Sequence, residues 1–260
     1  MKKPFFLLAV PFLFANGFFV AKMTAYPELA RWANRPEIPI VSALFVLLFA
    51  WPSFAATVRW LGARQGAMLL IALGVFALAI ESFAVITGVP YGRFSYGEKI
   101  GVKLFDVVPW TVPFAWSPVL LAAFFLARKF LFKSPHEYSC RGRDRWIIVA
   151  ATSAIALVFD LVLDPGAVAQ GFWKYQNGGF FYGVPLSNFV GWLVSGTAGT
   201  MIILRFIRRE KSEPPGAMLG SAWLIIVFWT SVCAWSQLWI PTLVGLILLG
   251  VIAPIFFANK

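Results

Sequence analysis

Three carboxylic acids lie in or at the end of long apolar stretches, where a charged side chain is costly. Glu81 is within the apolar run 66–87, and Asp160 is within the run 146–163, with Asp164 directly after it. An ionisable side chain at membrane depth costs at least about 2.5 kcal/mol on insertion scales unless it faces a cavity or a partner. The three acids are therefore candidates for function, and the chemistry that buried carboxyl groups offer is proton transfer.

Asp160 and Asp164 stand four residues apart, which places both carboxyl groups on one face of a helix. Two acids that close and partly buried do not easily ionise together, so we expect them to share a proton. Glu81 and Asp160 precede the ends of their runs by six and three residues, which puts them at a similar depth at roughly 1.5 Å per residue. An alternative role for these acids is structural, with their carboxyl groups hydrogen-bonded between helices. For Asp164, which precedes Pro165, a further alternative role is to end the helix.

Aromatic residues gather in and around the two segments that follow these runs, 88–106 and 164–185, which are also rich in Gly and Pro. The face of an aromatic ring attracts a cation by about 0.5 to 2 kcal/mol, so rings beside an acid suit a cationic intermediate. Their alternative role is the aromatic belt of the membrane interface. The residues concerned are Tyr91, Phe94, Tyr96, Trp110, Trp116, Trp173, Tyr175, Phe180, Tyr182 and Trp192.

The composition of the chain is that of a membrane protein, with 60% of its 260 residues hydrophobic and only 13% charged. We expect an all-α, polytopic bundle of about eight transmembrane helices, which forms a single integral-membrane domain over residues 1–260. The first apolar run follows Lys2 and Lys3 without a clear small-residue cleavage site, so it is interpreted as a helix and not as a signal peptide. Runs of about the 18 to 22 residues that cross roughly 30 Å of hydrocarbon lie at 5–21, 38–57, 66–87, 107–127, 146–163, 186–204, 217–238 and 240–257.

Lysine and arginine are distributed unevenly between the two sides that eight spans define. With the amino terminus inside, 15 of the 22 basic residues lie on the inner side. This predicts that both termini are cytoplasmic, that the protein is a multi-pass protein of the cell membrane, and that 88–106 and 164–185 face outward. The role of basic residues in setting the membrane orientation thus accounts for the net charge of +11, and no nucleic-acid partner is expected. The alternative role for the basic clusters is the binding of anionic lipid. The outer basic residues are Lys22, Arg31, Arg35, Arg93, Lys99, Lys103 and Lys174.

Other residue types leave few further chemistries open. The chain has one histidine, His136, and two distant cysteines, Cys140 and Cys233, so neither a His-based metal site nor a disulfide framework is expected. Asp160 and Asp164 form a DxxxD pattern, so an intramembrane prenyltransferase that uses them with Mg²⁺ is one alternative function. A proton-coupled membrane transporter is another, because acids inside helices form proton relays.

Two blocks of residues within about 75–195 carry a resemblance to a known family. The first contains Glu81, Thr87, Gly88, Pro90, Gly92, Tyr96, Gly101, Leu104, Pro109, Pro113 and Trp116. The second contains Asp160, Leu163, Asp164, Pro165, Gly171, Trp173, Gly179, Tyr182, Gly183, Val184, Pro185, Asn188, Phe189, Gly191 and Trp192. Together they resemble the signature of the CruF-type carotenoid biosynthesis family, the membrane carotenoid hydratases.

The resemblance implies addition of water to the terminal double bond of an acyclic carotenoid end group, as in lycopene, γ-carotene or a C50 analogue, to give a tertiary alcohol. Such a hydro-lyase, of the carotenoid 1,2-hydratase type, protonates the alkene and lets water capture the carbocation, which requires no metal and no cofactor. Its partners are the lipophilic carotenoid, water and membrane lipids, and association with other enzymes of the pathway stays open. A non-catalytic carotenoid-binding or assembly subunit is the alternative.

The chemistry of this reaction predicts roles for residues of this chain. We expect Asp160 or Glu81 to be the acid, and Asp164 to be the base or a proton-relay partner. Asn188 and Tyr182 are expected to position the water. The remaining substrate-binding residues are expected to line the site of the cation: Tyr91, Tyr96, Trp116, Trp173 and Trp192.

Overall fold

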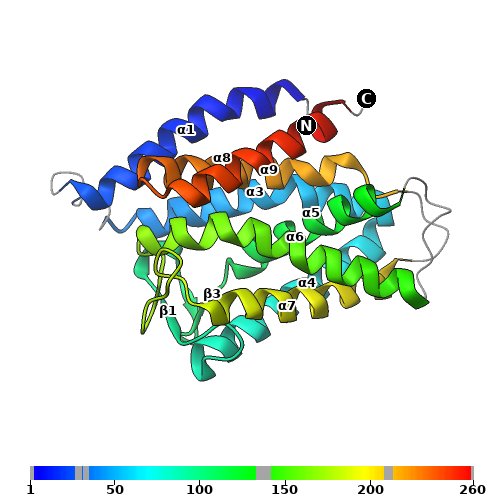
Figure 1. Cartoon of the computed structure of the whole chain (residues 1–260), viewed down its shortest axis with the longest axis horizontal. Helices are drawn as coiled ribbons and strands as arrows, with labels where there is room; N and C mark the ends of the chain where they lie inside the picture. The colour runs from blue at the N-terminus through cyan, green and yellow to red at the C-terminus, as the bar shows by residue number, and fades with distance from the viewer. Residues whose placement is uncertain (1–2, 27–30, 32–34, 133–141, 208–212, 259–260) are drawn as a thin grey trace.

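The computed structural model describes residues 3–26, 31, 35–132, 142–207 and 213–258. Within these ranges it contains eight helices that are long and apolar enough to cross a membrane, which confirms the predicted helical bundle. Successive helices run in opposite directions along the long axis of the molecule (Figure 1). They are α1 (Lys3–Ala25), α3 (Ile38–Leu61), α4 (Ala63–Thr87), α5 (Val112–Leu131), α6 (Gly142–Ala169), α7 (Leu186–Phe206), α8 (Leu219–Trp235) and α9 (Trp239–Ala258).

Two of the predicted helix boundaries differ from the observed ones by five residues or more, and local structure explains both. The helix predicted to end at 163 continues through Pro165 to Ala169, so Asp164 does not terminate it. Proline is tolerated inside membrane helices because neighbouring groups compensate for the missing N–H, and Pro165 is buried between helices. The helix predicted from 107 begins at Val112, because Val108–Pro109 (β3) instead pairs with Lys103–Leu104 (β2).

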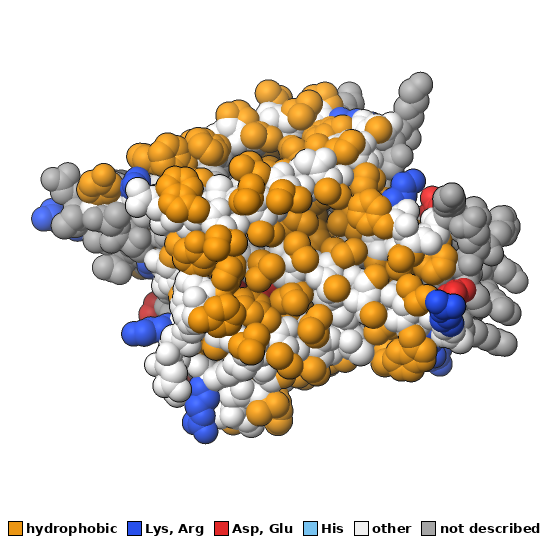
Figure 2. All heavy atoms as spheres, viewed as in Figure 1, with side chains coloured by type: hydrophobic (Ala, Val, Ile, Leu, Met, Phe, Trp, Pro, Cys, Tyr) orange, Lys and Arg blue, Asp and Glu red, His pale blue; other side chains and the backbone are white. Residues whose placement is uncertain are grey.

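Helices α5 and α8 form the centre of the bundle, and the apolar windows of their spans are 72% and 83% buried. The outer helices expose large apolar side chains toward the position of the lipid, and Figure 2 shows a broad hydrophobic band with basic side chains near its two ends. Polar groups join helices inside the bundle: Ser53 Oγ of α3 donates to the carbonyl of Met218 at 2.7 Å, and its N–H donates to Ser221 Oγ at 2.9 Å. Such bonds hold helices together where lipid offers no hydrophobic driving force.

The two aromatic segments meet at one end of the bundle. Phe94–Tyr96 (β1) and Trp173–Tyr175 (β4) pair as antiparallel strands, with Phe94 opposite Tyr175 and Tyr96 opposite Trp173. Side chains alternate along a strand, so these four aromatic residues share one face while Ser95 and Lys174 are exposed on the other. The ladder closes the end of the bundle above α4, α6 and α7. The shorter helical turns are η1 (Glu98–Ile100) and η3 (Gly216–Met218).

Both chain termini lie at the end of the bundle opposite β1 (Figure 1). Arg59, Arg64 and Arg205 belong to the end with the termini, whereas Lys99 and Lys174 belong to the end with the strands, as the charge count predicts. Which end faces the cytoplasm stays a prediction. Several residues of that count lie outside the described residues, as do His136 and Cys140: Lys2, Lys133, Arg141, Arg208, Arg209, Lys211 and Lys260.

The orientation is tested with single cysteines in a chain whose Cys140 and Cys233 are replaced by serine. We expect Ser95→Cys, exposed beside the ladder, to react with a membrane-impermeant maleimide in intact cells. Ala63→Cys, exposed at the opposite end as the first residue of α4, is expected to react only after lysis. The reverse pattern would place the ladder on the cytoplasmic side.

Candidate active site

A cavity of about 670 Å³, which includes its part open to solvent, lies beneath the β1–β4 ladder. Helices α3 to α7 and the aromatic segments contribute to its wall. Nine of the ten predicted site residues line it: Glu81, Tyr91, Tyr96, Trp116, Asp160, Asp164, Trp173, Asn188 and Trp192. The fold therefore brings together residues that are separated by more than 100 positions in sequence.

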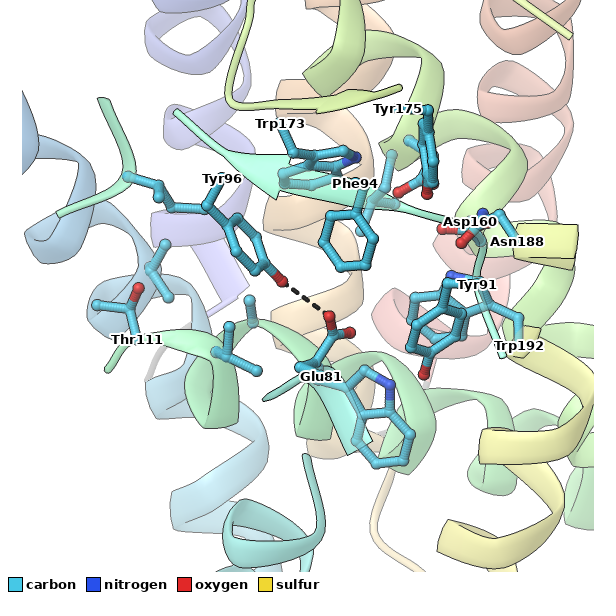
Figure 3. Close-up of a pocket in the computed structure, with 17 residues that line it drawn as sticks. Glu81, Tyr91, Phe94, Tyr96, Thr111, Asp160, Trp173, Tyr175, Asn188 and Trp192 are labelled. Carbon is cyan, nitrogen blue, oxygen red and sulfur yellow. Dashed lines mark hydrogen bonds between the residues drawn. The ribbon is translucent and has the colours of Figure 1, made fainter. Parts of the chain in front are cut away.

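Each of the three acids receives one hydrogen bond from a neutral donor. Tyr96 OH donates to Glu81 Oε2 at 2.9 Å, the contact drawn in Figure 3. Tyr175 OH donates to Asp164 Oδ2 at 2.8 Å. Asn188 Nδ2 donates to Asp160 Oδ2 at 2.7 Å. Of the described residues that line this cavity, none is Lys, Arg or His, so the acids are held by hydrogen bonds and not by ion pairs.

The tyrosine donors keep their protons at neutral pH. Burial raises the pKa of Tyr96 well above its ordinary value, and the charge of the neighbouring Glu81 carboxylate raises it further. Burial likewise raises the pKa of Tyr175, with the charge of Asp164 as the second cause. Both hydroxyl groups are therefore permanent hydrogen-bond donors to their acids across the physiological pH range.

Aromatic rings surround the space between the acids. The Phe94 ring, labelled in Figure 3, lines the same cavity and lies 5.3 Å from the ring of Tyr96 and 5.6 Å from that of Tyr175, centroid to centroid. The rings of Trp116 and Trp192 also line the cavity, and they stack on each other with their centroids 6.2 Å apart. Ring faces therefore border the cavity where a cation would form.

Two glycines bring the Tyr91 segment against the bundle. Gly88, with φ of 85°, ends α4 in the left-handed conformation and donates its N–H to Ala84 O, which turns the chain toward Tyr91. Gly191 of α7 lies against the Tyr91 ring, where an added Cβ would stand 2.3 Å from a ring carbon. Because Gly191 has no side chain, the Tyr91 ring can pack directly against α7 and line the cavity.

Four buried polar atoms in this region have no hydrogen-bond partner among the described residues: Asp160 Oδ1, Tyr91 OH, Trp116 Nε1 and Ser195 Oγ. Burial raises the pKa of Tyr91, whereas its polar neighbours Ser195 and Trp116 act to lower it, so the three groups lie close together. Buried polar groups without a hydrogen-bond partner are rare in folded proteins, because such groups normally bond to protein, water or a ligand. This cluster is therefore suited to hold a polar reactant.

One predicted site residue lies elsewhere. Tyr182 does not line the cavity, and its hydroxyl accepts the N–H of Ile240 at 3.4 Å, so the structure does not bring it together with the other predicted site residues. Its φ of 53° turns the chain just before α7. Phe180 is 75% exposed and does not line the cavity either. Conversely, Tyr175 and Phe94 line the cavity, although in the sequence only their aromatic character indicated a role there. Ser195 lies beside Tyr91, and nothing in the sequence indicated a role for it.

Comparison with known proteins identifies the family. Residues 39–252 match the family model described as carotenoid biosynthesis protein. The chain belongs to this family. Over 183 residues it is 33% identical to bisanhydrobacterioruberin hydratase of Haloarcula japonica, a match that covers 68% of this chain and 59% of that relative. No solved structure matches. The CruF-type resemblance is thereby confirmed, and the cavity belongs to a multi-pass membrane protein of carotenoid biosynthesis.

The Asn188–Asp160 bond makes the first prediction about this site. Asn188→Ala removes the donor to a fully buried carboxyl group, and a buried group without its partner costs about 1 to 3 kcal/mol of unfolding free energy. We expect a lower thermal unfolding midpoint for the purified protein in detergent. Asn177→Ala, in an exposed loop position, is the matched control and should leave the midpoint unchanged. Equal midpoints for both variants would contradict the assignment.

Proposed function

We propose that this protein is a carotenoid hydratase that adds water to the terminal double bond of an acyclic carotenoid end group and forms a tertiary alcohol. The observation that carries the proposal is a buried carboxyl group, Asp160, with one oxygen unpaired in an aromatic cavity. The family match and the hydratase relative support the reaction class. Lycopene, γ-carotene and C50 carotenoids with the same end group are the candidate substrates.

The hydrogen bonds suggest which acid donates the proton. Asn188 occupies Asp160 Oδ2 with a donor, so a proton on Asp160 belongs on Oδ1, the oxygen without a partner. Glu81 and Asp164 each accept a tyrosine hydroxyl, which stabilises their charged forms. We therefore assign Asp160 as the general acid, and either Glu81 or Asp164 as the carboxylate that accepts a proton.

The reaction then balances without a further reactant. Asp160 protonates the less substituted alkene carbon, and the electron pair of the double bond forms the new C–H bond. The tertiary carbocation is held among the rings of Phe94, Trp116 and Trp192. Water adds to it through oxygen and gives its proton to Glu81 or Asp164. A proton transfer back to Asp160 restores the enzyme.

Water is expected to bind at the unpaired polar groups. Tyr91 OH, Ser195 Oγ and Trp116 Nε1 are buried neighbours without partners among the described residues. Together they supply donors and acceptors for one water molecule, which commonly makes about three hydrogen bonds when buried. This cluster takes over the role that the sequence had suggested for Tyr182.

Asp160→Asn tests the general acid. The amide is similar in shape but cannot donate an acidic proton, so hydration should fall by about 10² to 10⁴-fold, with the unfolding midpoint close to that of the unchanged protein. The measurement is the gain of one water in carotenoids extracted from a lycopene-producing host and analysed by mass spectrometry. Hydration at the original rate by a folded Asp160→Asn protein would refute the assignment.

Tyr91→Phe tests the water site separately from protonation. Loss of one hydrogen bond to the attacking water should slow hydration by about tenfold, equivalent to about 1.4 kcal/mol. Protonation should persist, because Asp160 is unchanged. In D₂O the carbocation then returns to alkene by losing a proton, and the recovered carotenoid should gain deuterium at the less substituted carbon of its terminal double bond. Asp160→Asn should incorporate none, and Tyr91→Phe with unaltered hydration would remove the hydroxyl from the mechanism.

The alternative functions have distinct outcomes in the same assays. A prenyltransferase that uses Asp160 and Asp164 requires Mg²⁺, whereas the proposed hydration should proceed in excess EDTA. A transporter would move a solute into proteoliposomes without altering a carotenoid. A carotenoid-binding subunit would hold pigment that stays chemically unchanged when Asp160 is replaced.

A further inference from the structure

A second, larger cavity adjoins the acid cavity and is not used by the mechanism above. It encloses about 1240 Å³, which includes its part open to the surface, and lies among α1, α3, α5, α6 and α8. Five residues line both cavities: Val46, Ile100, Ala115, Leu163 and Trp173. The two spaces therefore meet, and Ala115 is exposed at the junction although most of α5 is buried.

The wall of the second cavity is hydrocarbon and aromatic. Phe45 and Phe228 lie with ring centroids 6.4 Å apart, and Phe228 and Trp229 lie 5.1 Å apart. Polar side chains in the wall are engaged within the protein: Lys99 Nζ donates to Gln170 O at 2.8 Å, and Asn16 Nδ2 donates to Phe12 O at 2.8 Å. The cavity therefore offers an occupant apolar contact and few free polar groups.

The second cavity reaches the lipid-facing surface between α1 and α3. Phe19 of α1 and Val41 of α3 both line it, and they are 40% and 43% exposed. Both belong to helices whose outer faces carry large apolar side chains. An occupant can thus come from the bilayer without crossing the aqueous loops.

We infer that the second cavity holds the polyene body of the carotenoid, and that the substrate enters from the bilayer between α1 and α3 with its end group passing Ala115 to the acids. The inference rests on the proposed function and adds the binding site and route of the substrate. A long apolar molecule whose reactive end must reach Asp160 needs a continuous apolar space behind that end. A stiff polyene also loses less conformational entropy on confinement than a flexible lipid chain does.

An obstruction in the second cavity tests the inference. Ser42→Trp places an indole in the cavity wall, 2 positions from Leu44, which is 59% exposed on the outer face of the same helix. Leu44→Trp is therefore the matched control. The assay compares kcat/KM for a full-length acyclic carotenoid with that for a short acyclic terpene carrying the same end group.

We expect Ser42→Trp to lower kcat/KM for the full-length carotenoid by at least about tenfold, equivalent to about 1.4 kcal/mol of transition-state binding, and to leave that for the short terpene unchanged. Leu44→Trp should alter neither value. Ser42→Leu, a smaller obstruction, should give an intermediate loss, so the test does not depend on the tryptophan variant alone. The unfolding midpoint shows whether each variant is folded. An equal loss for both substrates, or none for either, would overturn the inference.

Pigment binding separates failure of this inference from failure of the proposed function. The absorbance of carotenoid that copurifies with the protein reports binding without turnover. If the unchanged protein binds carotenoid but hydrates none, and Ser42→Trp loses the pigment, the proposed function fails and the binding site stands. If native mass spectrometry instead finds a phospholipid that Ser42→Trp excludes while carotenoid kinetics are unchanged, the occupant is lipid and the inference fails.

Discussion

A carboxyl group buried among apolar side chains must be neutral or receive hydrogen bonds, and the acid cavity is built around this requirement. Charged partners would form ion pairs and fix the acids in their ionised forms. The cavity instead supplies two tyrosines and one asparagine, each bonded to a single carboxyl oxygen. Such neutral donors orient the acids and leave proton exchange open. Asp160 Oδ1 is fully buried and has no hydrogen-bond partner among the described residues.

This requirement also explains why the connecting segments are structured. The donors Tyr96 and Tyr175 come from segments that follow α4 and α6, and the β1–β4 ladder holds these two segments together. Gly97 passes so close to Gly171 O that a Cβ would lie 2.4 Å away, which holds the ladder against the end of α6. Asn188, in the first turn of α7, reaches Asp160 from the side. Each acid thus depends on an element other than its own helix.

Hydropathy and residue type predicted the helices and the acids, because each is a local property of the sequence. The eight spans follow from apolar length, and Glu81 and Asp160 stand out because acids are costly in such runs. The pairing of Tyr96 with Glu81 and of Tyr175 with Asp164 could not be predicted, since it depends on the register between distant strands. The role of Ser195 could not be predicted either, because it depends on Tyr91, which comes from a distant segment and packs beside it. Tyr182 has the same aromatic context in the sequence as the residues that line the cavity, but its hydroxyl contacts the first turn of α9 instead.

The two cavities divide the requirements of a reaction between water and an oily substrate. Glu81 lies six residues from the end of α4 and Asp160 lies nine residues from the end of α6, about 9 to 14 Å inside the bundle at roughly 1.5 Å per residue. That depth is within reach of water from the ladder end, yet it borders a space that opens to lipid. A polar reactant and an apolar one can then approach the same carboxyl groups from different sides. In the proposed mechanism the burial of Asp160 also excludes bulk water, so the nucleophile would be a water molecule held by the unpaired polar groups at Tyr91.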